Sequence, residues 1–258
     1  MIIAGIDMGI QNTKVVIMRD NAVVGRGKAS TGGMDRPEQA KKAYDDALKS
    51  AGIDAKDVSK VIATGKGKFD IPFADDTYTE TVAAMRAAQY YFPDATGVMS
   101  AGADETLAAT VGSNRLIGEF VLNQKCCAGL GTFISYLARK LGKTIEQAAA
   151  VDCPDCGTMN DGCVVFAELD ALSMMNDGAA PDEIIATALG AVATRAATVL
   201  ADLTASPGDR VVLLGGLAKS PAFVAALEKS VGLKLLIPED PEFGGAVGAA
   251  ICGEKGLM

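Results

Sequence analysis

Three glycine turns, each directly after an apolar run, constrain the fold of this chain more than any other feature. They are Asp7-Met8-Gly9, Ala101-Gly102-Ala103 and Leu214-Gly215-Gly216-Leu217-Ala218. A glycine lets the backbone approach a phosphate or adenosine closely, and the N–H groups that result form an anion nest. Most glycines after strands only form turns. Three in this order favour phosphate binding, because Asp7 at the first of them is also well placed to hold hydrated Mg²⁺.

Strand-like and helix-like patterns alternate around these turns. The strands expected from apolar runs lie at 2–6, 15–18 with 23–24, 58–63, 97–100, 210–214 and 233–237. The helices expected from periodicity and end signals lie at 37–51, 80–91, 181–203, 221–230 and from Gly244 onward. Both halves of the chain run from strands through a helix to a strand that ends in glycine. This weak internal duplication predicts an α/β chain of two domains that face a cleft.

Two cysteines, Cys126 and Cys163, each stand just before an amphipathic pattern. The apolar positions are Phe133, Ile134, Leu137 and Leu141 after the first, and Val165, Phe166, Leu169 and Leu172 after the second. We therefore expect both sulfurs near helix N-termini, where unpaired N–H groups and the helix dipole stabilise a thiolate. Such thiolates bind soft metals or iron–sulfur clusters. The alternative is that both are buried and inert, as free cysteines usually are.

The other cysteines receive plainer interpretations. Cys127 and Cys252 are expected to pack in the core. Cys153-Pro154-Asp155-Cys156 has the spacing of a zinc or iron–sulfur site, but no second paired motif completes four ligands. A solvated loop is therefore the default interpretation of this segment.

Composition excludes several function classes. The chain has no histidine, so His-based triads, His general bases and His metal ligands are excluded. Its formal net charge of −8 argues against binding to nucleic acid or to an anionic membrane. Nothing at the start resembles a signal peptide, and the apolar run around 184–201 is interrupted by Arg195. We expect a soluble protein of the reducing cytoplasm.

The order Gly5-Ile6-Asp7-Met8-Gly9, a glycine at 102 and Gly215-Gly216-x-Ala218 resembles the actin/hexokinase/Hsp70 ATPase superfamily. Four further motifs resemble the activators of 2-hydroxyacyl-CoA dehydratases and the ATPase subunits of benzoyl-CoA reductase, the BadF/BadG/BcrA/BcrD ATPase family. They are Thr64-Gly65-x-Gly67, Asn123-x-Lys125-Cys126-x-Ala128-Gly129-x-Gly131, Cys163-x-Val165-Phe166-Ala167-Glu168 and Gly244-Gly245-Ala246-Val247-Gly248-Ala249-Ala250. The resemblance covers nearly the whole chain, and the cysteine motifs are its most specific part.

The resemblance implies two ribonuclease-H-like halves around a nucleotide cleft. The first is 1–97, with the helix of 240–258 packed back on it, and the second is 98–239 with the cluster cysteines. ATP or ADP with Mg²⁺ would be bound by Asp7, Gly9, Thr13, Lys14, Gly102, Gly215, Gly216, Ala218 and Gly245. Asp7, Asp104 and Glu105 would be the catalytic residues. Cys126 and Cys163 would give two of the four ligands of a 4Fe–4S cluster that bridges two subunits.

The implied function is ATP-driven activation of electrons in an anaerobic enzyme system. Reduced ferredoxin or flavodoxin would be the donor, and the second ATPase subunit could be identical or different. The acceptor expected first is a CoA-ester reductase, benzoyl-CoA reductase, and the alternative acceptor is a 2-hydroxyacyl-CoA dehydratase. Two rivals remain: a small-molecule kinase with Asp104 or Glu105 as general base, and a degenerate ATPase kept as a structural partner.

Three departures from the family pattern bear on catalysis. Ile10 and Gln11 follow Gly9 where the dehydratase activators carry small hydroxyl residues, and Ala84 stands where relatives have histidine. Ser100 occupies the place of the first acid of the second phosphate turn, so Asp104 or Glu105 must replace the later one. We therefore expect ATP to bind, and hydrolysis by this chain alone to be slow.

Overall fold

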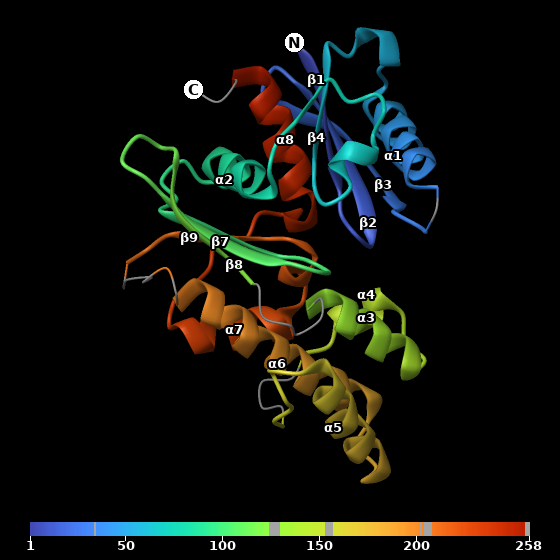
Figure 1. The fold of residues 1–258 in the computed structure, drawn as a ribbon, viewed down its shortest axis with the longest axis vertical. Helices are drawn as coiled ribbons and strands as arrows, with labels where there is room; N and C mark the ends of the chain where they lie inside the picture. Colours follow the sequence, from blue (N-terminus) through green and yellow to red (C-terminus); the bar gives the residue numbers. More distant parts are fainter. Residues whose placement is uncertain (34, 124–129, 153–156, 202, 204–207, 256–258) are drawn as a thin grey trace. The chain divides into compact units, whose positions relative to one another are not determined.

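The computed structural model describes residues 1–33, 35–123, 130–152, 157–201, 203 and 208–255 (Figure 1). The chain divides into two compact units. Unit 1 comprises Met1–Ala95 and Glu242–Met258, and unit 2 comprises Thr96–Pro241. Each unit contains one sheet with helices packed on it, and the predicted α/β class is confirmed.

The sheet of unit 1 has the order β3-β2-β1-β4-β5. Its strands are β1 (Ile2–Met8), β2 (Asn12–Arg19), β3 (Ala22–Ser30), β4 (Lys60–Thr64) and β5 (Asp76–Thr77). Strand β1 pairs antiparallel with β2 and parallel with β4. Most residues of β1 and β4 are buried, because both faces of the sheet are covered. Because β1 and β4 are parallel, their C-terminal ends lie at the same edge of the sheet.

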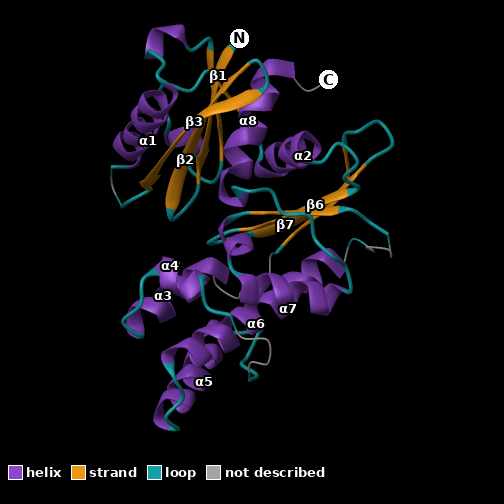
Figure 2. Ribbon diagram, turned by 180° about the vertical axis from the view of Figure 1, so that it is seen from behind, coloured by secondary structure: helices purple, strands orange, loops and turns teal. Residues whose placement is uncertain are grey.

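Helices cover the two faces of this sheet separately (Figure 2). Helix α1 (Arg36–Ala51) packs on the face that carries Ala4 and Ile6. Helix α8 (Gly244–Lys255) packs on the other face, with Ile3 and Ile62, and α2 (Glu80–Tyr91) packs against α8. Short 3₁₀ helices lie at Ala55–Asp57 and Lys68–Asp70. Alternate residues of β1 thus enter two different cores.

The sheet of unit 2 has the order β8-β7-β6-β9. Its strands are β6 (Gly97–Ala101), β7 (Thr106–Val111), β8 (Ile117–Leu122) and β9 (Val211–Leu214). Strand β6 pairs antiparallel with β7 and parallel with β9. The two glycine turns that follow β6 and β9 consequently lie at the same edge of this sheet.

The longest helix forms the centre of the unit 2 core. It is α6 (Pro181–Ala201), and its neighbours are α3 (Leu130–Lys140), α4 (Ile145–Ala149), α5 (Val164–Asn176) and α7 (Pro221–Val231). Two 3₁₀ helices complete the described chain, at Gly216–Lys219 and Pro241–Phe243. Among the described residues, α6 is long and apolar enough to cross a membrane, with a mean hydropathy of 1.7. However, 67% of that window is buried inside the structure, as in the core helix of a globular protein.

Two expectations differ from the structure. The run 233–237 is not a strand: a single parallel bridge joins Val212 to Leu236. Leu236 exchanges backbone hydrogen bonds with Val211 and Leu213, but Pro238, the next residue on the side that faces β9, has no N–H to donate. The hairpin of β7 and β8 was not anticipated, although its turn at 112–116 contains glycine and asparagine.

Candidate functional site

The first glycine turn of unit 1 places a carboxylate and an ammonium side by side. Asp7 and Lys14 are paired across β1 and β2, and Lys14 Nζ lies 2.8 Å from Asp7 Oδ2. Both side chains are mostly buried, with exposed fractions of 17% and 15%. A carboxylate suits a hydrated hard cation and an ammonium suits a phosphate oxygen. The pair therefore offers one partner to each component of a metal–phosphate ligand.

Glycines from two distant segments press against Asp7. Gly65, in the turn after β4, has a φ of +91°, and a Cβ there would lie 2.6 Å from Asp7 Oδ1. Gly245, in the first turn of α8, would place a Cβ 2.9 Å from Asp7 Oδ2. The start of α8 thus lies beside the carboxylate, where the positive end of a helix dipole favours negative charge. The motifs at 64–67 and 244–250 meet at this one side chain.

Thr13 supports the turn from inside the sheet. Its side chain is fully buried, and its Oγ1 lies 3.2 Å from Thr31 Oγ1. Thr31 Oγ1 in turn donates to the carbonyl of Gly9 at 2.7 Å. The structure therefore brings Asp7, Gly9 and Lys14 together at the turn and places Thr13 behind it. No local sequence signal pointed to Thr31, because its contact with Gly9 spans the β1–β2–β3 meander.

The second glycine turn is the tight loop between β6 and β7 in unit 2. The N–H of Gly102 donates to the carbonyl of Glu105 at 3.0 Å and closes the loop. Asp104 is exposed at its tip, whereas Ser100 is half-buried on β6 opposite Leu107 and Leu214. Of the predicted catalytic residues, Asp104 and Glu105 therefore lie in unit 2 and Asp7 lies in unit 1.

Gly215 and Gly216 serve different purposes in the third turn. Gly215 has a φ of +96°, and a Cβ there would lie 2.2 Å from the carbonyl oxygen of Ala101. This close approach presses the turn after β9 against the end of β6. At Gly216 a Cβ would meet no described atom within 4 Å, so its backbone faces open space. Ala218, by contrast, is buried and packs in the unit 2 core.

The first turn of α3 is hydrogen-bonded to the loop between β6 and β7. The N–H of Gly131 donates to Gly102 O at 3.2 Å, and the N–H of Thr132 donates to Ala103 O at 2.9 Å. Thr132 Oγ1 also donates to Ala103 O, at 2.8 Å. The N–H groups that a helix leaves unpaired at its start are thus satisfied by this loop. The loop and the helix that follows Cys126 are therefore mechanically joined.

Cys163 is the N-cap residue of α5, as predicted, with φ −133° and ψ 121°. Its N–H donates to Asn160 Oδ1 at 2.7 Å, and its side chain is partly exposed. Cys252 is buried in α8, where burial raises the pKa of its thiol to about 11. Cys163 therefore has the exposure and the helix position that a metal-ligating thiolate needs, and Cys252 does not.

The other four cysteines, Cys126, Cys127, Cys153 and Cys156, lie outside the described residues. Within the described ranges no group of three or more His, Cys, Asp or Glu side chains is placed to hold a metal ion.

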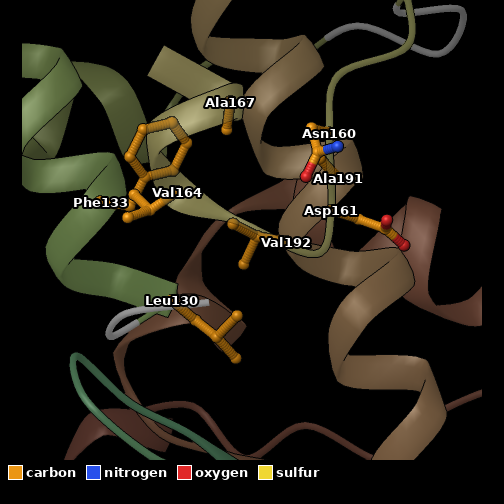
Figure 3. A pocket seen from close by; sticks show the side chains of 8 residues that line it. All are labelled: Leu130, Phe133, Asn160, Asp161, Val164, Ala167, Ala191 and Val192. Carbon is orange, nitrogen blue, oxygen red and sulfur yellow. The ribbon is translucent and has the colours of Figure 1, made fainter. Parts of the chain in front are cut away.

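Helices α3 and α5 meet α6 around a small, mostly apolar pocket (Figure 3). Its lining residues are Leu130, Phe133, Asn160, Asp161, Val164, Ala167, Ala191 and Val192. Phe133 of α3 and Val164 of α5 both line it. Tyr136 OH also donates to Glu168 Oε1, which links the same two helices one turn further on. The helices that follow Cys126 and Cys163 are therefore packed as one group.

Comparison with known proteins finds an ATPase family and relatives named as components of enzymes that act on CoA esters. The sequence pattern of the BadF/BadG/BcrA/BcrD ATPase family matches residues 4–253. The activator of lactoyl-CoA dehydratase from Anaerotignum propionicum is 31% identical over 255 residues, covering 96% of this chain and 95% of that protein. A benzoyl-CoA reductase subunit from Thauera aromatica is 27% identical over 266 residues, covering 98% and 93%.

The fold also matches a solved structure. The activator of the 2-hydroxyisocaproyl-CoA dehydratase from Clostridium difficile, with bound ADPNP, superposes with a TM-score of 0.89 at 23% identity. The match covers 97% of this chain and 93% of that one. At this identity the likeness establishes the shared fold.

Proposed function

The chain belongs to the BadF/BadG/BcrA/BcrD ATPase family, and from that premise we propose that it is the activating ATPase of a 2-hydroxyacyl-CoA dehydratase. The 31% identical relative is named for activating lactoyl-CoA dehydratase, whereas the benzoyl-CoA reductase relative is 27% identical. The comparisons therefore favour the dehydratase over benzoyl-CoA reductase, which the sequence had placed first. A kinase gains no support, because the family is one of ATPases.

The observation that carries the proposal is the junction between the β6–β7 loop and α3. In unit 2 the loop from Gly102 to Glu105 would bind phosphate through its backbone, and Asp104 or Glu105 would orient the attacking water. In unit 1 Asp7 would hold hydrated Mg²⁺, and Lys14 would exchange Asp7 for a phosphate oxygen. A nucleotide that displaces the loop would displace the first turn of α3 with it, because their hydrogen bonds join them.

Cys163 fits one ligand position of an iron–sulfur cluster, since it is accessible at a helix N-terminus. Together with Cys126 it would supply two of four thiolates, and a second ATPase subunit would supply the others. The bound 4Fe–4S cluster would carry a low-potential electron from reduced ferredoxin or flavodoxin to the dehydratase component in the cytoplasm. The packing of α3 and α5 around Phe133 and Val164 would let both cysteine-bearing segments respond to one loop.

Replacing Thr132 with valine should weaken the response of α3 to nucleotide. The change removes the hydroxyl bond to Ala103 O and keeps the backbone bond. A neutral hydrogen bond contributes about 1 kcal/mol, so the nucleotide-dependent difference in hydrogen exchange at 131–134 should fall roughly fivefold. Exchange is measured with and without MgADPNP, and the cluster potential is titrated in the same samples. Nucleotide can change the hydrogen exchange or the cluster potential only to the extent that it binds two conformations of the protein with different affinities.

Thr194→Val is the matched control, because Thr194 Oγ1 donates within α6 to Gly190 O at 3.1 Å. It should leave both nucleotide effects unchanged. Equal nucleotide effects in Thr132→Val and Thr194→Val would show that the loop–helix junction does not transmit the signal.

Restoring an acid at position 100 should accelerate hydrolysis by the isolated chain. Ser100 ends in a neutral hydroxyl, which cannot supply the charge or accept the proton that a carboxylate does. A general base contributes typically ~10²–10⁴-fold, so Ser100→Asp should raise steady-state phosphate release by at least about tenfold. Ser113→Asp, in the exposed turn between β7 and β8, is the control. Fast release by the unmodified chain, with no gain in Ser100→Asp, would mean that Asp104 or Glu105 suffices and that no different sister subunit is needed.

A further inference from the structure

Helix α5 turns its large apolar side chains toward solvent. The exposed fractions are 60% for Val165, 57% for Phe166, 54% for Leu169 and 47% for Leu172. We call these four residues the α5 stripe. The apolar positions that the sequence pattern identifies on this helix are thus not on the side that packs against the rest of unit 2.

Small side chains make the contact with the rest of unit 2 instead. Among the described residues of α5, Ala167 and Ala171 are the buried ones, and they belong to the same core as α6. Val164 and Ala167 line the pocket that α5 shares with α3 and α6 (Figure 3). Clustered apolar exposure of this kind marks an interaction surface, whereas single exposed apolar residues need no explanation.

The chain around the stripe is strongly acidic. Residues 144–194, which include α4, α5 and the first half of α6, contain nine Asp or Glu and no Lys or Arg. At 100° per residue, Glu168 and Asp170 fall on opposite sides of the stripe. Basic groups do occur at the end of α3: Lys143 Nζ pairs with Asp182 Oδ1 at 2.6 Å, and Lys140 lies over the ring of Tyr136. The margin of the stripe nevertheless carries net negative charge.

We infer that the α5 stripe docks a protein partner that presents an apolar patch bordered by Lys and Arg. Resting on the proposed function, that partner is the dehydratase component that receives the electron. A second copy of this chain seated along the stripe would bring acidic margin against acidic margin, and an anionic membrane would be repelled in the same way. A second subunit that shares the cluster would instead meet Cys163 at the start of α5. The stripe begins two residues after Cys163, so a partner seated on it lies beside that thiol.

The test compares two phenylalanines of unit 2 that are equally exposed. Phe166 lies in the stripe, and Phe120 lies on β8 with an exposed fraction of 55%. Binding to purified lactoyl-CoA dehydratase of Anaerotignum propionicum is measured anaerobically by biolayer interferometry with MgADPNP. Phe166→Glu and Leu169→Glu should weaken the affinity at least about tenfold, as at the centre of an interface. Phe120→Glu should change it less than about twofold. Circular dichroism confirms that each variant is folded.

The acidic margin is tested with Glu168→Gln, which keeps the oxygen that accepts from Tyr136 OH. The unmodified protein should bind more weakly as NaCl rises, because salt screens exposed charges, and the variant should show a smaller loss. Equal affinities of Phe166→Glu and Phe120→Glu would overturn the proposal, as would no binding by the unmodified protein. Stripe variants that dissociate a homodimer in sedimentation but bind the dehydratase normally would assign the stripe to a second copy and also overturn it.

Iron content and ATP turnover are measured in the same variants, so that a failure of this proposal can be told apart from a failure of the proposed function. Loss of docking with normal iron and turnover supports the stripe alone. Absence of iron and turnover in the unmodified protein would refute the proposed function, whereas the binding comparison would still decide the role of α5.

Discussion

Cys163→Ser should lose nearly all bound iron when the protein is purified anaerobically. A serine oxygen is a hard and weakly acidic ligand, whereas iron–sulfur clusters are held by cysteine thiolates. The fold should survive, because residue 163 is the N-cap of α5 and serine is among the preferred N-cap residues. Iron and acid-labile sulfide are assayed per subunit, together with the visible absorption of the cluster.

The matched control is Cys252→Ser, which replaces a buried cysteine in α8 whose thiol pKa is raised to about 11 by burial. It should keep its iron, although a hydroxyl in that apolar site should lower stability. Cys126→Ser should behave as Cys163→Ser does, and Cys127→Ala should keep the cluster; both positions lie outside the described residues, so this pair rests on the sequence motif. Full iron content in Cys163→Ser would show that Cys163 is not a cluster ligand. Iron loss in Cys127→Ala would show that Cys127 is the ligand in place of its neighbour Cys126.

Elements with strong local signals were predicted well. Helix α1 has a proline in its first turn and ends at Gly52, which is left-handed with a φ of 64°. Helix α7 has the same two signals, Pro221 in its first turn and the left-handed Gly232 at its C-cap, and it also has Ser220 as N-cap. The prediction of a strand at 233–237 was wrong because the pairing of Leu236 with β9 cannot continue at Pro238, which has no N–H.

The sequence predicted the motifs of the site one by one, but it did not predict which of them lie close together in space. Each motif around Asp7 is recognisable in the sequence, but only the fold shows that Gly65 and Gly245 both press against that carboxylate. The hydrogen bonds from Thr132 to Ala103 and from Thr31 to Gly9 are likewise tertiary contacts, which the periodicity of the sequence cannot predict. Periodicity located the large apolar positions of α5 correctly, but it did not show that the core covers Ala167 and Ala171 on the opposite side.

Gly216→Val should bind MgATP at least about 100-fold more weakly, equivalent to about 2.7 kcal/mol, and still fold. The structure separates these two effects. A Cβ at Gly216 would meet no described atom within 4 Å, and the residue is not among the described glycines with positive φ. The protein can therefore accept the side chain, which would occupy the open space where we propose that adenosine binds.

The neighbouring glycine provides the contrasting variant. Gly215→Val would place a Cβ 2.2 Å from the carbonyl oxygen of Ala101 and would force a β-branched residue to a φ of +96°, so it should fail to fold or melt far below the unmodified protein. Affinity is measured by calorimetric titration with MgATP and MgADPNP, and stability by thermal unfolding of the same samples. Gly216→Ala should give an intermediate loss, because the loss should grow with the volume placed in the ligand's space. An unchanged affinity in a folded Gly216→Val protein would remove adenosine from this turn, and the junction of the β6–β7 loop with α3 would then remain as the nucleotide contact of unit 2.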